Sequence, residues 1–176
     1  MTSTDHELLY WVDEQDQVLG PCRRGDAHRQ GLRHRAVHIL VFNSAGQVFL
    51  QERSLSKDIN PGLWDTSSAG HVDFGESYDQ CAIRELREEL GIATETVPER
   101  LFRIPASALT GWEFVEVYRI EHDGPLQLNP DEISDGRWVS PTLLDALIEQ
   151  SPNQFTTSLR ALWQKFRGSH PQASLA

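Results

Sequence analysis

The stretch that decides the fold is Gly70 to Ile92, GHVDFGESYDQCAIRELREELGI. Within it, Ser77 is followed three residues later by Gln80, which is the signature of a helix that begins with a capping box. Gly91 suits the position just after the last helical turn, where the backbone often takes a positive φ. Apolar residues recur every four positions and predict one buried stripe: Ala82, Leu86 and Leu90. The pattern therefore predicts an amphipathic helix over residues 77–90.

This helix carries more glutamate than its packing requires. Glu85, Glu88 and Glu89 stand at i, i+3 and i+4, so their carboxylates share one helix face and repel one another. Arg84 relieves part of the repulsion, but an Arg84–Glu88 surface pair alone does not explain why the carboxylates converge. A divalent cation does explain it, because Mg²⁺ is commonly held by a few carboxylates together with water and phosphate oxygens.

The same spacing resembles the Nudix box, G-x5-E-x7-R-E-U-x-E-E-x-G-U, in which U is an aliphatic residue. Every specified position of the box is occupied in this chain: Gly70, Glu76, Arg84, Glu85, Leu86, Glu88, Glu89, Gly91 and Ile92. The resemblance implies an α/β fold, a Nudix-type α/β/α sandwich with a mixed β-sheet, in which a loop–helix–loop module carries the chemistry.

The resemblance also implies roles for the box residues. Glu85, Glu88 and Glu89 match ligands of Mg²⁺ or Mn²⁺, while Glu76 and Arg84 match residues that orient the helix and its ligands. A bound cation would neutralise charge as the P–O bond breaks and would acidify the attacking water. One carboxylate would then take the proton, and Glu89 is a candidate for that role, although the sequence fits a pure ligand equally well.

Beyond the box, several segments resemble the isopentenyl-diphosphate-isomerase-like branch of this family, over roughly residues 8–165. They are GLRHRA at 31–36, LQERSLSKD at 50–58, PGLWDTSSAGHV at 61–72 and GES at 75–77, after a short N-terminal β-hairpin. True isomerases carry a catalytic cysteine just before the Gly-His of the box, whereas this chain has Ala69 there. Neither Cys22 nor Cys81 falls at that position, so the resemblance implies loss of isomerase activity.

Other parts of the isomerase metal site have counterparts here. His34 and His71 match two of its histidine ligands, His28 matches a third loosely, and Glu113 falls near its essential glutamate. Because imidazole favours a softer ion than Mg²⁺, a second metal such as Mn²⁺ bound by His34, His71 and Glu113 is a hypothesis. The alternative is that each histidine has a structural hydrogen bond and that Glu113 is a solvated carboxylate.

The phosphate and organic groups of a substrate need binding residues beyond the box. Arg53 and Lys57 stand at the end of a strand and the start of the loop before the box, so both are candidate phosphate-binding residues. Trp112, Phe114 and Tyr118 alternate onto one strand face and could stack on a base, although ordinary packing within a sheet is the simpler interpretation.

The remaining elements follow from local pattern. Residues 8–12 and 18–20 predict a hairpin, and the basic segment from Arg23 to Arg35 predicts a solvated loop or a phosphate-attracting rim. Strands are expected at 36–42, 47–51, 65–69, 101–104, 112–120 and 137–139, and helices at 141–148 and 156–166. We expect one Nudix domain over 1–168, whose first 30 residues form the hairpin and basic loop, and a mobile tail at 169–176.

Composition excludes several classes of function. The chain has 176 residues and a formal charge of −10, which opposes a surface that wraps DNA or RNA. Its two cysteines cannot form a disulfide framework, no apolar run is long enough to span a membrane, and the N-terminus lacks the features of a signal peptide. We therefore expect a cytoplasmic protein whose partner is a small organic diphosphate. Nudix proteins are often dimers, so a homodimer is compatible with the sequence.

The function expected from these features is metal-dependent hydrolysis of the diphosphate linkage in a nucleoside diphosphate derivative or another organic diphosphate. An isopentenyl-diphosphate isomerase is one alternative, and Ala69 opposes it. A non-catalytic Nudix-fold binding module is the other, and the complete set of box glutamates opposes that interpretation.

Overall fold

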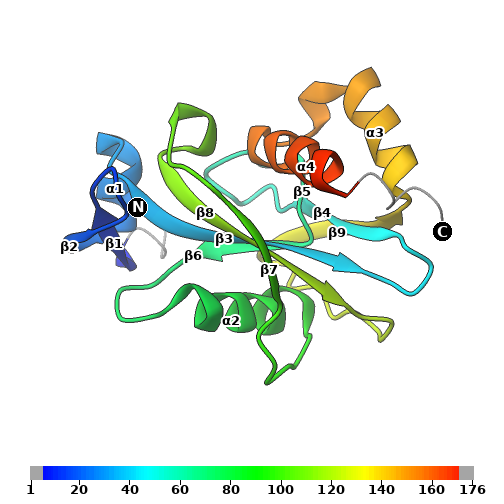
Figure 1. Cartoon of the computed structure of the whole chain (residues 1–176), viewed down its shortest axis with the longest axis horizontal. Helices are drawn as coiled ribbons and strands as arrows, with labels where there is room; N and C mark the ends of the chain where they lie inside the picture. The colour runs from blue at the N-terminus through cyan, green and yellow to red at the C-terminus, as the bar shows by residue number, and fades with distance from the viewer. Residues whose placement is uncertain (1–5, 171–176) are drawn as a thin grey trace.

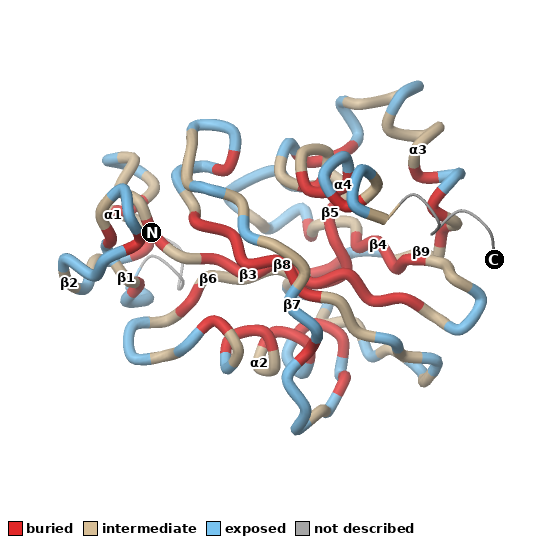
Figure 2. The backbone as a smooth tube through the Cα atoms, in the orientation of Figure 1, coloured by how far each residue is buried: buried red, intermediate tan, exposed pale blue. Residues whose placement is uncertain are grey.

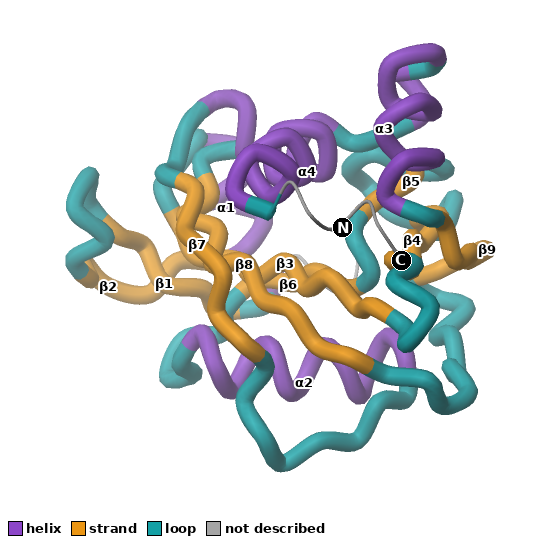
Figure 3. Tube along the Cα trace, turned by 45° about the vertical axis from the view of Figure 1, so that its right-hand side comes forward, coloured by secondary structure: helices purple, strands orange, loops and turns teal. Residues whose placement is uncertain are grey.

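The computed structural model describes residues 6–170 as a mixed β-sheet covered by helices on both faces. Helix α2 (Tyr78–Leu90) lies against one face, and helices α3 (Pro141–Gln150) and α4 (Thr157–Ser169) lie over the other (Figures 1 and 3). A separate two-stranded hairpin, β1 (Leu8–Val12) and β2 (Val18–Arg23), precedes them. The predicted α/β/α sandwich with a mixed sheet and an N-terminal hairpin is therefore confirmed.

The main sheet has seven strands. They are β3 (His34–Phe42), β4 (Val48–Arg53), β5 (Trp64–Asp65), β6 (Ser68–His71), β7 (Glu99–Ile104), β8 (Glu113–Glu121) and β9 (Ile133–Val139). Two short 3₁₀ turns, Ala108–Thr110 and Pro152–Gln154, complete the elements together with helix α1 (Arg24–Gln30).

Strand β3 is the centre of the sheet, and its pairing positions the site. One edge runs parallel to β8 over the full length of β3. The other edge is shared, because β6 pairs with residues 36–39 and β4 pairs only at Phe42. Strand β4 therefore leaves β3 beyond Phe42, while β6 stays paired with β3 and leads into the box. The Glu89 side chain of the box contacts both β4 and β6 at the gap between them.

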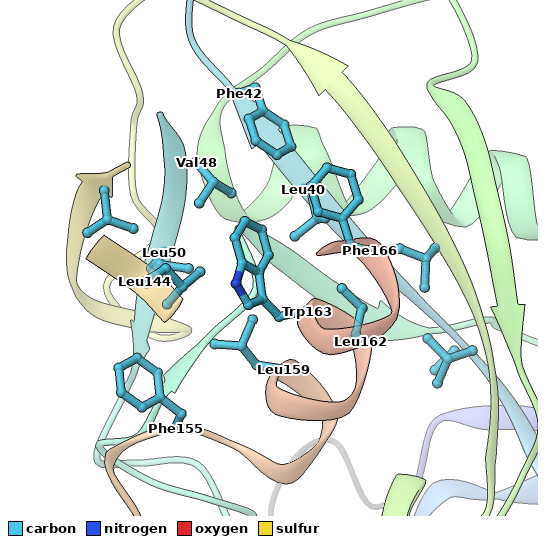
Figure 4. Close-up of a cluster of buried hydrophobic side chains, with 14 residues drawn as sticks. Leu40, Phe42, Val48, Leu50, Leu144, Phe155, Leu159, Leu162, Trp163 and Phe166 are labelled. Atoms are coloured by element: carbon cyan, nitrogen blue, oxygen red, sulfur yellow. The ribbon is translucent and has the colours of Figure 1, made fainter. Parts of the chain in front are cut away.

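Two cores hold the layers together, one on each face of β3. Leu40 and Phe42 face α4, where Trp163 and Phe166 pack on them (Figure 4). Val37, Ile39 and Val41 face α2 and contact its predicted stripe, whose three residues are fully buried: Ala82, Leu86 and Leu90. The buried tube of β3 and β8 between the helical layers is visible in Figure 2.

Helix α2 begins and ends as the sequence predicts. The Ser77 side chain accepts from the backbone N–H of Gln80, and the Gln80 side chain accepts from the backbone N–H of Ser77, which completes the capping box. Gly91 has φ 69°, and its N–H donates to the carbonyl of Arg87. These local contacts fix both ends of the helix that carries the glutamates.

Two expectations about the chain were wrong. The basic segment contains helix α1 rather than a loop only, because Arg24 and Ala27 find buried positions and Gly31 ends the helix at φ 64°. The strand expected at 65–69 is two strands, β5 and β6, separated by Thr66 and Ser67. The Ser67 hydroxyl accepts from the N–H of Val41 and donates to the carbonyl of Phe49, so it bridges β3 and β4 in place of a continuous ladder.

Helix α4 runs to Ser169, one residue into the segment predicted as a tail, and residues 171–176 lie outside the described part of the chain. Within residues 6–170, no helix has the length and apolar character needed to cross a membrane.

The hairpin is fastened to the sheet through one buried carboxylate. Asp16, in the turn between β1 and β2, is 8% exposed and accepts hydrogen bonds from Arg35, Arg103 and the hydroxyl of Tyr78. The Arg35 guanidinium also lies 4.7 Å from the ring centroid of Tyr10. Asp16 thus connects the hairpin to β3, β7 and α2 at once.

We predict that Asp16→Asn lowers the free energy of unfolding by about 2 to 4 kcal/mol, since two guanidinium groups lose their buried counterion. Urea denaturation measures this. Glu14→Gln, in the same turn but with a side chain 70% exposed, is the matched control and should change stability by less than about 0.5 kcal/mol. Equal effects of the two substitutions would contradict the role assigned to Asp16.

Candidate active site

A cavity of about 660 Å³ opens where the box, β3 and the loop after β4 meet. Most of the site residues expected from the sequence line it: Arg53, Lys57, His71, Arg84, Glu85, Glu88, Glu89 and Glu113. His34 lies fully buried behind His71, and Glu76 lies behind Arg84. The fold therefore brings all the predicted residues to one place, although they come from four strands, one helix and two loops.

The three box glutamates do not have equal surroundings. Glu85 and Glu89 are 8% and 4% exposed, whereas the Glu88 side chain is 51% exposed. Oε2 of Glu89 accepts from the N–H of Ala69 at 3.1 Å and from Nε2 of Gln51 at 3.2 Å. Glu89 is therefore held at the edge of β6, in the gap that β4 and β6 leave beside β3.

Gly70 has a steric reason to be glycine. A Cβ at this position would lie 1.8 Å from Oε1 of Glu85, well inside any contact distance. The absence of a side chain lets the Glu85 carboxylate approach the backbone of β6. The close approach of the Glu85 carboxylate therefore requires a glycine at the first position of the box.

Arg84 organises the carboxylates from one side. Its Nε and one terminal nitrogen bind both oxygens of Glu76 at 2.9 Å, and the same terminal nitrogen donates to the carbonyl of His71 at 3.0 Å. Its other terminal nitrogen donates to Glu85 at 2.6 Å and to Glu88 at 3.1 Å. One guanidinium therefore ties α2 to the loop before it and to the end of β6.

Burial makes the two inner carboxylates costly to ionise. It raises the pKa of Glu89 to about 7, although the hydrogen bond from the N–H of Ala69 lowers it. Burial and the neighbouring Glu89 also raise the pKa of Glu85 well above its ordinary value, and Arg84 opposes this only in part. A divalent cation would supply the missing positive charge, and the all-oxygen donor set fits Mg²⁺.

Three histidines form a second cluster in which their ring nitrogens converge. His28, His34 and His71 each offer a nitrogen within 4.8 Å of the others. Nδ1 of His34 lies 2.8 Å from the carbonyl of Leu32, so it carries the proton and leaves the lone pair on Nε2. Within residues 6–170, Nε2 of His34 and Nε2 of His28 are buried without a hydrogen-bond partner. Such orphaned lone pairs fit a metal ligand set.

Glu113 closes this cluster from β8. Its Oε1 lies 3.1 Å from Nε2 of His71 and 3.7 Å from Nε2 of His34, the second distance being too long for a hydrogen bond. Burial alone would raise the pKa of Glu113, but the hydrogen bond and the charges of the two histidines outweigh it and hold the pKa well below its usual range. Burial, with the nearby histidines, lowers the pKa of His28 to about 4, so the His28 ring is neutral imidazole at pH 7.

The two predicted phosphate-binding residues have carboxylate neighbours. Lys57 forms an ion pair with Glu132, and a terminal nitrogen of Arg53 lies 3.6 Å from Asp65. The basic segment was predicted as a solvated loop or a phosphate-attracting rim, and its Arg24, which lies in α1, lines the cavity and binds both oxygens of Asp58. Its role depends on the helix that local pattern did not reveal.

The aromatic residues of β8 are ordinary sheet residues, as the simpler interpretation held. Tyr118 is buried in the core beneath α2 and its hydroxyl donates to Asp79 at 2.7 Å. Phe114 is 7% exposed, and Trp112 lies outside β8. None of the three lines the cavity as described for residues 6–170.

Comparison with known proteins places this geometry in a family. The NUDIX domain model matches residues 32–159. The chain belongs to the Nudix family. An uncharacterized Nudix hydrolase of Pseudomonas aeruginosa is 42% identical over 144 residues, which is 80% of this chain and 83% of that protein.

Two further proteins are similar to this chain over most of its length. An isopentenyl-diphosphate Delta-isomerase of Ruegeria pomeroyi is 38% identical over 157 residues, covering 85% of this chain and 84% of the isomerase. A crystal structure of a Deinococcus radiodurans protein matches with a TM-score of 0.80 at 32% identity, over 90% of this chain and 98% of that one. The resemblance to the isomerase-like branch is confirmed, and the choice between hydrolase and isomerase has to come from the site.

The raised pKa of Glu89 gives a pH-dependent stability that metal should remove. Without divalent cations, the unfolded chain loses this proton near pH 4.5 while the folded protein keeps it to about pH 7. The contribution of Glu89 to the stability of the folded protein is therefore fully present below pH 4.5 and is lost as the pH rises through 7. Relative to Glu89→Gln, the wild type in EDTA should lose stability between pH 5 and pH 8, and Mg²⁺ should restore it. Parallel Tm profiles of the two proteins in EDTA would contradict this.

Proposed function

We propose that this Nudix protein hydrolyses the diphosphate linkage of an organic diphosphate, such as a nucleoside diphosphate derivative, with Mg²⁺ or Mn²⁺ as cofactor. The observation that carries the proposal is the pair of buried carboxylates, Glu85 and Glu89. Among residues 6–170, Glu85 forms an ion pair with Arg84, and Glu89 forms none. Such a pair is unfavourable by itself and becomes favourable around a divalent ion that binds phosphate oxygens.

Each predicted residue has a place in this function. Glu85, Glu88 and Glu89 would hold the cation, with Glu88 at the solvent side where a substrate enters. Arg84 and Glu76 would keep the ligands aimed at it through the contacts described above. When bound, the cation neutralises developing charge on the phosphates and acidifies water.

Arg53, Lys57 and Arg24 would bind the phosphate groups on the opposite wall of the cavity. Each is already held by a carboxylate: Asp65, Glu132 and Asp58. These pairs keep the long side chains in the cavity, and a substrate phosphate can exchange with the partner carboxylate at little cost in side-chain entropy.

Isomerisation is the second candidate, and one observation favours it. The convergence of His28, His34, His71 and Glu113 gives this chain the histidine-rich cluster that the resemblance to isomerases implies. Against it, position 69 is a methyl group and cannot protonate carbon. We therefore propose that the histidine cluster holds a second, softer ion such as Mn²⁺ that serves hydrolysis.

A substrate panel tests the proposed reaction. With Mg²⁺ or Mn²⁺, the purified protein should release phosphate or a nucleoside monophosphate from at least one organic diphosphate, and it should not interconvert five-carbon diphosphates. Glu89→Gln should lower kcat by about 100-fold or more while the Tm stays near that of the wild type. Glu149→Gln, exposed on α3, is the control and should leave kcat unchanged. Wild-type rates in Glu89→Gln would refute the assignment of Glu89.

Metal counting tests the second site. His71→Ala should lower the number of Mn²⁺ ions bound per chain by one, because it removes a ligand from the cluster and leaves the box carboxylates in place. Equilibrium dialysis with atomic absorption measures the stoichiometry, and His122→Ala, far along the chain in the loop after β8, is the control. An unchanged stoichiometry in His71→Ala would end the proposal of a histidine-bound ion.

A further inference from the structure

His38 is a buried polar residue in the middle of an apolar strand. Its neighbours along β3 are Val37 and Ile39, and the side chain is only 5% exposed. It lines the same cavity as Glu85 and Glu89, and neither the box nor the histidine cluster includes it. The polar atoms of a buried imidazole normally form hydrogen bonds or take part in the chemistry of a site. For His38, hydrogen bonding accounts for only one of the two ring nitrogens.

The hydrogen bonds of His38 fix which nitrogen carries the proton. Nδ1 lies 2.8 Å from Oγ1 of Thr66, and that hydroxyl donates its single proton to the carbonyl of Ser68 at 3.3 Å. Thr66 therefore accepts from Nδ1–H, and the carboxylate of Asp65, 3.9 Å from the same nitrogen, favours the same arrangement. With the proton on Nδ1, the lone pair is on Nε2, which has no hydrogen-bond partner among residues 6–170.

The pairing of the strands sets His38 beside Ala69 of β6, the residue whose backbone N–H holds Glu89. His38 is directly opposite Ala69 in the antiparallel β3–β6 pair, and side chains in such positions have Cβ atoms about 4.5 to 5.5 Å apart. The N–H of Ala69 donates to Glu89. His38 alternates with Ala36 and Leu40 on the face of β3 that α4 covers, and on that side its ring lines the cavity that Glu85 and Glu89 line from α2.

The carboxylates nearby are already engaged. Oε2 of Glu89 accepts two hydrogen bonds, and Oε1 of Glu85 accepts from Arg84. Asp65 accepts from the N–H of Thr66 and from the hydroxyl of Thr156. These groups suit ligands and structural anchors better than a proton acceptor.

We propose that His38 is the general base of the hydrolysis, an inference that rests on the proposed function. The oxygen of the attacking water forms a bond to phosphorus, and one of its protons passes to Nε2 of His38. The bridging P–O bond breaks, and its electron pair stays on the oxygen of the departing phosphate or organic phosphate. Asp65 lies 3.9 Å from Nδ1 of the ring, and the charged groups that line the cavity with His38 include Arg53 of β4, Glu85 and Glu89 of α2, and Lys57 and Glu132 from the loops.

His38→Asn is the decisive variant. The asparagine amide can still donate a hydrogen bond to Thr66, but the side chain has no basic nitrogen at the position of Nε2. At saturating Mg²⁺, which keeps the box carboxylates ionised, kcat should fall by about 10²- to 10⁴-fold. The affinity for Mg²⁺ and the Tm should stay close to the wild type. The decrease of kcat at acid pH should disappear, and added imidazole should restore part of the rate.

A second measurement does not depend on activity. The ¹⁵N shifts of the His38 ring should show a protonated Nδ1 and an unprotonated Nε2 in the metal-free protein. Thr66→Val, of nearly the same shape, removes the accepting hydroxyl and should shift the ring toward a mixture of tautomers while lowering kcat less than His38→Asn does.

The outcomes are distinguishable. Wild-type kcat and an unchanged pH profile in His38→Asn would overturn the role of His38 while hydrolysis itself stands. Loss of Mg²⁺ affinity in that variant would make His38 a ligand and would also overturn it, as would a ring protonated on Nε2. A wild-type protein that cleaves no diphosphate would instead overturn the proposed function, and this inference with it.

Discussion

The repulsion between Glu85 and Glu89 is the constraint on which the site depends. Both carboxylates are buried, and both approach the backbone of β6 at Gly70 and Ala69. Arg84 compensates for part of their charge, and burial leaves both pKa values raised. A fold that keeps such a pair loses stability unless a cation joins it, so the metal, the raised pKa values and the glycine of the box express one physical requirement.

Two other groups of residues line the cavity around this pair, one of histidines and one of basic side chains. The histidine cluster offers nitrogen lone pairs at one end of β3, and His38 offers another four residues further along the same strand. The basic residues come from outside the box, and Arg24 of α1 lines the cavity directly after the hairpin in the chain. Asp16 connects that hairpin to the sheet.

Local pattern predicted what local contacts determine. The capping box of Ser77, the αL position of Gly91 and the stripe along α2 depend on neighbours within a few residues, and all were found as expected. The exposure of Glu88 could not be predicted, because sharing a helix face does not say which carboxylates the sheet covers. Helix α1 could not be predicted from local pattern because it is short and depends on tertiary burial of Arg24 and Ala27. In the sequence, His38 is one polar residue in an apolar run, and nothing there indicates a role. Its proposed role follows from its neighbours in the fold, which are Asp65, Thr66 and Ala69.

The most direct test of the central claim is the position of the ion itself. A crystal soaked in Mn²⁺ should show an anomalous peak that Glu85 and Glu89 share, with oxygen ligands around it and Arg84 still bound to Glu76. Anomalous density at the histidine cluster alone, or none at either place while Glu85 and Glu89 keep their present contacts, would contradict the account.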